Sequence, residues 1–213
     1  MYIPQHFEET RVDVMHALMR SHPFATLVTG AGGALDIHHL PTVVDTSTEP
    51  LGTLCAHVAR ANPVWKTLDG AQATIVFQGA QAYISPNWYP SKHAHGKAVP
   101  TWNYAIVHAR VNAHAIQDGD WLLQHLTNLT DQQEASQAQP WKLSDAPEGF
   151  IDKMRQAVVG LQLDIVELNG KWKTSQNRPK PDRLGVVAGL LDDGSDAAKA
   201  MAALVMANNE SAT

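Results

Sequence analysis

Aromatic and polar side chains alternate in one segment of the chain, from Tyr83 to Tyr104. It holds two of the six tryptophans and three of the four tyrosines, namely Tyr83, Trp88, Tyr89, Trp102 and Tyr104. The polar residues among them are Ser85, Asn87, Ser91, Lys92, Lys97, Thr101 and Asn103. Flat rings can stack on a planar ligand, while hydroxyl, amide and ammonium groups can hold a phosphate or a ring edge. The segment therefore indicates a ligand site; the alternative is an aromatic core with a polar connection.

A second stretch, near the C-terminus, is locally basic. Its cations are Lys171, Lys173, Lys180, Arg178 and Arg183, against one acidic residue, Asp182. With Ser175, Gln176 and Asn177 it could complete a phosphate pocket, because ammonium and guanidinium groups donate charged hydrogen bonds. A solvated run of charge is the alternative reading, and contact with nucleic acid is a weaker one.

The histidines and the single cysteine do not indicate a metal or a nucleophilic site. His38 and His39 are adjacent, so on a strand they face opposite sides, whereas His108 and His114 share a face but lie too far apart for one ion. Cys55 lies inside an apolar run and is expected to be inert. No G-x-S-x-G elbow and no glycine-rich phosphate loop occurs.

The elements that position these residues follow from hydrophobic spacing. Strands are expected at 24–29, 35–45 (interrupted by Pro41), 52–58, 73–77, 82–85, 101–116 and 161–167. Turns are expected at 30–33 and at Asn169-Gly170, and 86–100 is expected to be a loop. Helices are expected from Val12 to Ser21, after Asn62-Pro63, from Asp118 or Asp120 to Leu129, at 150–158 and at 197–207. Six or seven short strands in hairpins predict an antiparallel, mainly β (α+β) barrel decorated by helices.

Composition limits the class of protein. The chain has 213 residues, 44% of them hydrophobic, which is enough for one compact core. The formal net charge is −5, so a broadly basic nucleic-acid surface is not expected. One cysteine excludes an internal disulfide, and no signal peptide or apolar span of membrane length is seen. A cytoplasmic location is expected.

Several motifs together resemble one family. They are Met1-Tyr2-Ile3-Pro4, His39-Leu40-Pro41, the run from His57 to Pro63, Gln81 to Tyr89, Val99 to Tyr104, Lys173 to Arg178, and Asp182-Arg183. They resemble the PaiB-type family of FMN-binding negative transcriptional regulators of bacteria, and the resemblance runs over most of the chain. It implies an FMN-binding split β-barrel and a homodimer with the flavin at the subunit interface. The expected organisation is a single domain, 1–213, with a helical C-terminal extension from about residue 178.

The resemblance also implies which residues hold the flavin. The expected cofactor-binding residues are His57, Asn62, Ser85, Trp88, Lys92, Thr101, Trp102, Asn103, Lys173, Gln176, Asn177 and Arg178. Ser85, Lys92 and Thr101 suit phosphate or ribityl oxygens, the two tryptophans suit a ring face, and Asn103 suits the pyrimidine edge. A phosphate could also sit at the helix start beside Asn62, although this residue could equally cap that helix.

The function implied is that of a flavin-binding regulator. The alternatives are a flavin-dependent reductase or oxidase, a haem-handling protein on the same barrel, or a barrel that has lost its cofactor. No acid–base pair for catalysis is evident, but a flavin brings its own redox chemistry. Direct DNA binding is doubtful, because no helix-turn-helix pattern is evident and the chain is acidic.

Overall fold

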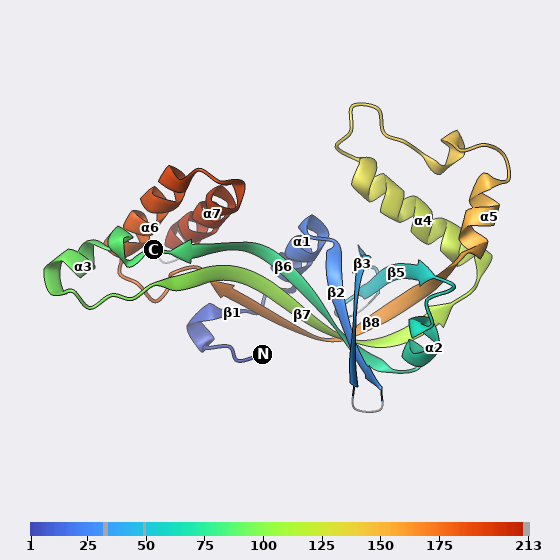
Figure 1. Ribbon diagram of the computed structural model, residues 1–213, viewed down its shortest axis with the longest axis horizontal. Helices are drawn as coiled ribbons and strands as arrows, with labels where there is room; N and C mark the ends of the chain where they lie inside the picture. The colour runs from blue at the N-terminus through green and yellow to red at the C-terminus, as the bar shows by residue number, and fades with distance from the viewer. Residues whose placement is uncertain (32–33, 49, 211–213) are drawn as a thin grey trace. The chain divides into compact units, whose positions relative to one another are not determined.

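A computed structural model describes residues 1–31, 34–48 and 50–210. The Gly32-Gly33 part of the expected turn therefore lies outside the described residues. Within them the strands are β1 (Glu8–Glu9), β2 (Phe24–Ala31), β3 (Ala34–Pro41), β4 (Val43–Asp45), β5 (Thr53–Ala59), β6 (Gln72–Ile84), β7 (Thr101–Ile116) and β8 (Val158–Lys173). They form one sheet in the order β3-β2-β6-β7-β8-β5-β4, and β1 pairs with β8 (Figure 1).

Seven α-helices accompany the described strands. They are α1 (Val12–Ser21), α2 (Val64–Leu68), α3 (Pro90–His95), α4 (Gly119–Glu134), α5 (Phe150–Gln156), α6 (Lys180–Asp193) and α7 (Asp196–Glu210). Short 3-10 turns occur at Gln5–Phe7 (η1), Pro86–Trp88 (η2) and Leu143–Asp145 (η3). No helix within the described ranges is long and apolar enough to cross a membrane.

The described chain divides into two compact units that share the long strands. Unit 1 comprises residues 1–15, 78–107 and 169–213, and unit 2 comprises 16–77 and 108–168. The single-domain organisation expected from the sequence stays a prediction.

Unit 1 has its own apolar core, in which helices α6 and α7 pack on the end of β6. Its buried members are Ala82, Ile84, Tyr89, Val186, Val187, Leu190, Ala198, Met201, Ala202 and Val205. Alternation along β6 explains this contact, since Ala82 and Ile84 point one way while Tyr83 between them is exposed. The core therefore fixes the end of β6 and the turn that follows it.

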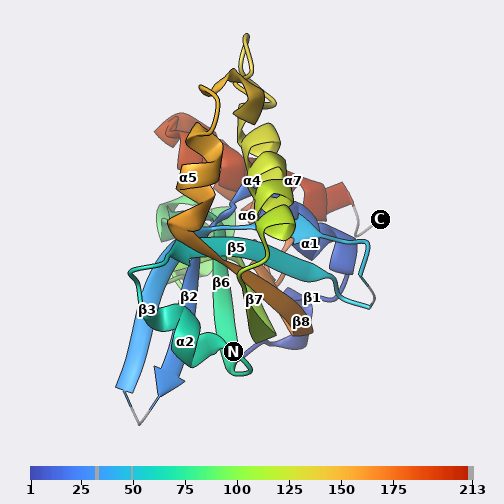
Figure 2. The ribbon, with the colours of Figure 1, turned by 90° about the vertical axis from the view of Figure 1, so that its right-hand side faces the viewer.

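In unit 2, α4 and α5 lie side by side (Figure 2). The Arg155 guanidinium ties them together by donating to the carbonyl oxygen of Gly119 at 3.0 Å. The Asp118 carboxylate caps α4 by accepting from the Trp121 amide at 2.8 Å, as the expected start of this helix requires.

The expected strand at 101–116 is confirmed residue for residue as β7. Pro41 was expected to mark an edge or a bulge. Strand β3 ends at Pro41 and lies at one edge of the sheet, so the expected edge position is confirmed. Strand β4, which follows, lies at the other end of the sheet order. The expected helix after Asn62-Pro63 is confirmed as α2.

Other expectations were wrong. The strands expected at 73–77 and 82–85 are one strand, β6, and the loop expected at 86–100 contains η2 and α3. The hairpin turn at Asn169-Gly170 does not form, because β8 continues to Lys173 and Gly170 pairs with Glu9 of β1. A Cβ at Gly170 would lie 2.8 Å from the Glu9 carbonyl oxygen, so glycine serves close approach of two strands there.

Candidate functional site

The end of β8 and the turn after it carry the cations of the candidate site. Lys173 Nζ donates to Thr101 Oγ1 at 2.5 Å and to the carbonyl oxygen of Trp102, both at the start of β7. Lys171 Nζ lies 5.3 Å from the centre of the Tyr104 ring. Adjacent strands therefore bring the sequence-predicted Lys173, Thr101 and Trp102 together.

Positive charge in this turn is not balanced locally. Burial lowers the pKa of Lys173, and repulsion from Lys171 and Arg178 lowers it further. In the described part of the chain, no ion pair joins these three cations to a carboxylate. An anion bound here would relieve the repulsion, so the turn has the electrostatics of a phosphate site.

The backbone of the turn is held in an uncommon conformation. Ser175 has φ = 66°, the only non-glycine residue with positive φ in the described ranges. The Asn103 side-chain amide donates to Ser175 Oγ at 2.9 Å, and both residues are buried. Gln176 folds back, with Oε1 accepting from the Thr174 amide at 2.7 Å. Such strain persists only where neighbouring contacts hold it, as they do here.

Arg178 extends this arrangement to the segment after β6. Its guanidinium lies 4.7 Å from the ring centre of Tyr89, which is buried. Ser91 in α3 donates to the Asp182 carboxylate in α6 from both its amide (3.0 Å) and its hydroxyl (2.6 Å). Helix α3, which lies within the segment expected to be a loop, is thus fixed to α6 of unit 1.

An open pocket of about 430 Å³ adjoins the start of β7. It is lined by Gln81, Ala82, Tyr83, Trp88, Trp102, Leu190, Asp193, Ser195, Ala197 and Ala198. The Tyr83 and Trp102 rings meet edge to face at 6.3 Å, and both are about half exposed. The Trp88 ring lies against α6 at Gly189. A Cβ at Gly189 would lie 2.3 Å from this ring, so only glycine leaves room for it there. Three of the five rings of the aromatic segment therefore line one pocket.

The remaining predicted residues of unit 1 have partners of their own. Ser85 Oγ accepts from the Asn87 amide at 3.2 Å, and Lys92 Nζ donates to Asn87 Oδ1. Asn177 is exposed. Asn103 was expected to face a flavin edge, but only 1% of its surface is exposed and its amide is committed to Ser175. In this structure Asn103 positions the turn.

His57 and Asn62 belong to unit 2. His57 Nδ1 faces Nε2 of His125 at 3.0 Å, beneath α4. Asn62 Oδ1 accepts from the Val64 amide at 3.0 Å and so caps the start of α2, the alternative that the sequence left open.

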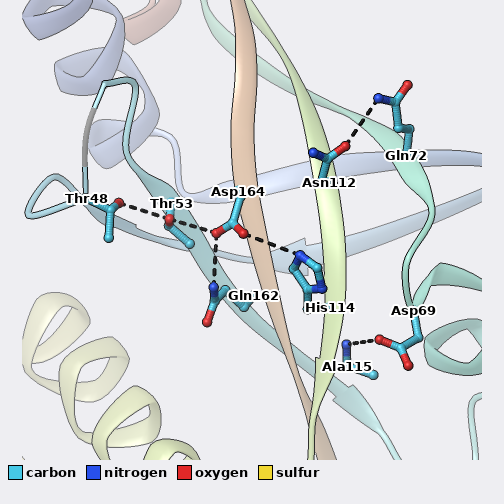
Figure 3. A network of polar contacts seen from close by, with 9 residues as sticks. All are labelled: Thr48, Thr53, Asp69, Gln72, Asn112, His114, Ala115, Gln162 and Asp164. Atoms are coloured by element: carbon cyan, nitrogen blue, oxygen red, sulfur yellow. Dashed lines mark hydrogen bonds and ion pairs between the residues drawn. The ribbon is translucent and has the colours of Figure 1, made fainter.

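Unit 2 also contains an extended polar network on β5, β7 and β8 (Figure 3). The Asp164 carboxylate accepts from Thr53 Oγ1 at 3.0 Å and from Gln162 at 3.1 Å, and it lies 3.4 Å from His114 Nε2. These contacts tie three strands together. Among the described residues no group of three His, Cys, Asp or Glu side chains could share a metal ion.

The sequence predicted a helical extension from about residue 178, but not the bounds of its first helix, α6, or the contacts that α6 makes. The apolar pattern of Val186, Val187 and Leu190 was the available signal, as was the four-residue spacing of Gly185 and Gly189. The pairing of Ser91 with Asp182, which are 91 positions apart, had no signal in the sequence.

Comparison with known proteins identifies the family. A family model described as "Putative FMN-binding domain" matches residues 1–167. The chain belongs to this family. The match confirms the expected FMN-binding family and its cofactor, FMN. The cationic turn at 171–178 lies just beyond the matched residues.

Two relatives of this FMN-binding protein align over nearly its whole length. An uncharacterized protein from Emericella nidulans is 30% identical over 99% of this chain and 98% of its own. The protease synthase and sporulation protein PAI 2 of Bacillus subtilis is 29% identical over 96% of each chain. A FAD and haem binding protein from Mycobacterium smegmatis has a similar fold, with a TM-score of 0.59 and 16% identity over 78% of this chain and 73% of that one. The expected α+β, antiparallel split-barrel class is confirmed.

The residues of unit 1 fit FMN. The cofactor combines a planar ring with a terminal phosphate, and unit 1 combines an aromatic pocket with unbalanced cations. The pocket volume lies within the range usual for small-ligand sites. Lys173 touches the backbone of Trp102, whose ring lines the pocket, so both features meet at the start of β7.

Proposed function

We propose that this protein binds FMN in unit 1, with the phosphate on the cationic turn and the ring in the aromatic pocket. Lys173 and Arg178 would neutralise the phosphate, and Thr101 would contribute a hydroxyl. Trp102 and Tyr83 would face the ring, while Asn103 and Ser175 hold the turn in position. Bound FMN supplies reversible electron transfer, which the side chains of this site do not provide.

The unbalanced charge of the turn carries this proposal. Burial lowers the pKa of Lys173, and the nearby Lys171 and Arg178 lower it further. No carboxylate forms an ion pair with these three cations in the described part of the chain. Like charges gathered without a counterion destabilise a fold unless a ligand or a function compensates.

The test compares FMN with riboflavin, which lacks the phosphate. Purified protein should show flavin absorption bands, and the double variant Lys173→Ala/Arg178→Ala should bind FMN at least 10- to 100-fold more weakly, the value of about one lost charged hydrogen bond. Riboflavin affinity should change little. Lys180→Ala, an exposed cation of the same stretch, is the matched control. Equal weakening of both flavins would refute the phosphate assignment.

We further propose that the flavoprotein is a cytoplasmic homodimer with a regulatory role of the PaiB type. The motifs shared with that family and the similarity to PAI 2 support the role. Leu35 (75%) and Ile37 (57%), which are exposed on one face of the edge strand β3, support self-association. A net charge of −5 argues against direct DNA contact. A monomer at micromolar concentration in sedimentation would refute the dimer.

A flavin-dependent oxidoreductase is the second candidate, because the aromatic pocket is open and a second molecule could reach a ring bound there. Bleaching of the bound flavin by NADH or NADPH, with turnover, would favour the enzyme. A Soret band in the purified protein would favour a haem-handling role. DNA binding that survives moderate salt would favour a direct regulator.

A further inference from the structure

A buried and a half-buried imidazole join helix α4 to the sheet of unit 2. Nδ1 of His57 in β5 lies 3.0 Å from Nε2 of His125 in α4. His125 is 3% exposed, and its second nitrogen, Nδ1, is buried without a hydrogen-bond partner in the described structure. A protonated imidazole carries hydrogen on both nitrogens. A single proton on His125 therefore puts an N–H on the buried Nδ1, which has no acceptor among the described residues. With both rings protonated the contact itself is lost, because only one hydrogen fits between the two facing nitrogens.

Among the described residues, the imidazole pair is the one side-chain hydrogen bond between this part of α4 and the sheet, while Arg155 of α5 donates to the Gly119 carbonyl oxygen. The Trp121 ring stacks on His125 with centres 5.3 Å apart and planes 23° apart. It also lies flat on β8, where a Cβ at Gly160 would come within 2.3 Å of it. Gly160 pairs with His57 across the β5–β8 ladder. The first turns of α4 are therefore held by the buried Leu122 side chain, the Trp121 ring and the Arg155 bond, and the imidazole pair is their hydrogen bond to the sheet.

No neighbouring charge compensates a proton on this pair. On β5 the next residue of the same face is Cys55, whose pKa is raised to about 11 by burial and by Asp45 and Asp164, so the thiol is neutral. On β8 the residues opposite are Gly160 and Gln162. From α5, Arg155 reaches Gly119. Within the described ranges neither imidazole forms an ion pair with a carboxylate.

Falling pH therefore shifts the equilibrium from α4 packed on the sheet (the seated state) toward α4 released from it. Burial lowers the pKa of both rings, and burial together with His57 brings the pKa of His125 to about 4. In a released, hydrated helix the ordinary value of about 6.5 returns. Below pH 6.5 the released state binds more protons than the seated state, so falling pH favours release.

We propose that the His57–His125 pair is a proton-sensitive latch, through which acid releases α4 from the sheet before the core of unit 2 unfolds. Release would expose the face of β5 that carries Cys55 and His57. Neither residue contributes to the flavin site proposed in unit 1, so a test of the latch does not depend on whether the protein binds flavin.

Hydrogen–deuterium exchange between pH 7 and pH 5, corrected for intrinsic rates, tests the latch. His125 alone should shift the equilibrium toward release roughly 20-fold over this range. Amides of α4 should lose protection by about that factor, while those of Ala109, Val111 and Ala113 in β7, whose side chains are fully buried, should not. Equal loss in both segments would mean global acid unfolding and would overturn the proposal.

A matched variant keeps the hydrogen bond but removes the titration. In His57→Asn/His125→Gln, the side-chain amides replace Nδ1 and Nε2 at similar positions. Protection of α4 in this variant should be independent of pH between 7 and 5. His39→Gln, an exposed histidine of unit 2, should behave like the wild type. Acid release that persists unchanged in the amide variant would also overturn the proposal. Should that variant not fold, potentiometric proton uptake by the wild type must show the release coupled to histidine titration.

Discussion

The strained turn at Ser175 allows a sharp test of how the cationic site is held. Ser175 has φ = 66°, a conformation that costs a non-glycine residue about 1–2 kcal/mol. Its hydroxyl also accepts from the buried Asn103 amide at 2.9 Å. Ser175→Ala keeps the strain and leaves that amide without a partner, which should destabilise the fold by about 1–3 kcal/mol. Ser175→Gly loses the same bond but relieves the strain, so it should be about 1 kcal/mol more stable than the alanine variant.

Urea denaturation followed by tryptophan fluorescence measures this order, and a double-mutant cycle with Asn103→Ala measures the coupling of the two side chains. The FMN-to-riboflavin affinity ratio reports separately on the position of Lys173 and Arg178. An alanine variant as stable as the glycine variant, or a coupling energy near zero, would show that neither strain nor the Asn103 bond holds this turn.

Three further outcomes are expected. Gly189→Ala places a Cβ within 2.3 Å of the Trp88 ring and should destabilise the fold by about 1–3 kcal/mol, whereas Ala188→Gly on the exposed side of α6 should cost about 1 kcal/mol or less in the same urea assay. Because burial and the nearby cations lower the pKa of Lys173, FMN affinity should begin to decline at a pH below 10.5, the ordinary value for lysine. Lys173→Arg should show a flat profile in the same titration, and a flat wild-type profile would contradict the phosphate role. With its pKa raised to about 11, Cys55 should react with iodoacetamide at pH 8 about 100-fold more slowly than a solvent-exposed thiol whose pKa has the ordinary value of 9.0, and a rate near that of the exposed thiol would contradict its burial.

The sequence predicted well what depends on local spacing. Alternation over 101–116 gave the bounds of β7, and an acidic cap followed by periodic apolar residues gave the start of α4. The set of different motifs identified the family, because the motifs are spread over most of the chain and each requires particular residue types. The motifs also placed Lys173, Thr101 and Trp102 among the expected flavin-binding residues, and the structure brings these three into contact.

Local signals failed where a distant segment decided the outcome. Asn169-Gly170 has the composition of a hairpin turn, yet pairing with Glu9 keeps it within β8. The prolines and glycine of 86–100 suggested a loop, yet the contact of Ser91 with Asp182 holds a helix there. In both cases tertiary contacts outweighed the local preference.

Residue types along the chain determined that this protein has the donors, rings and cations of a flavin site, because those are properties of side chains and of their spacing. Only the tertiary structure decided which of them are free to meet a ligand. Asn103 and Ser175 are 72 positions apart, and their bond makes Asn103 a positioning residue. His57 lies beneath a helix that begins some sixty residues later, facing His125. The donor and acceptor groups of a polar side chain are the same at every position in the chain. Its burial and its hydrogen-bond partner decide whether it can contact a ligand, and both depend on how distant segments pack.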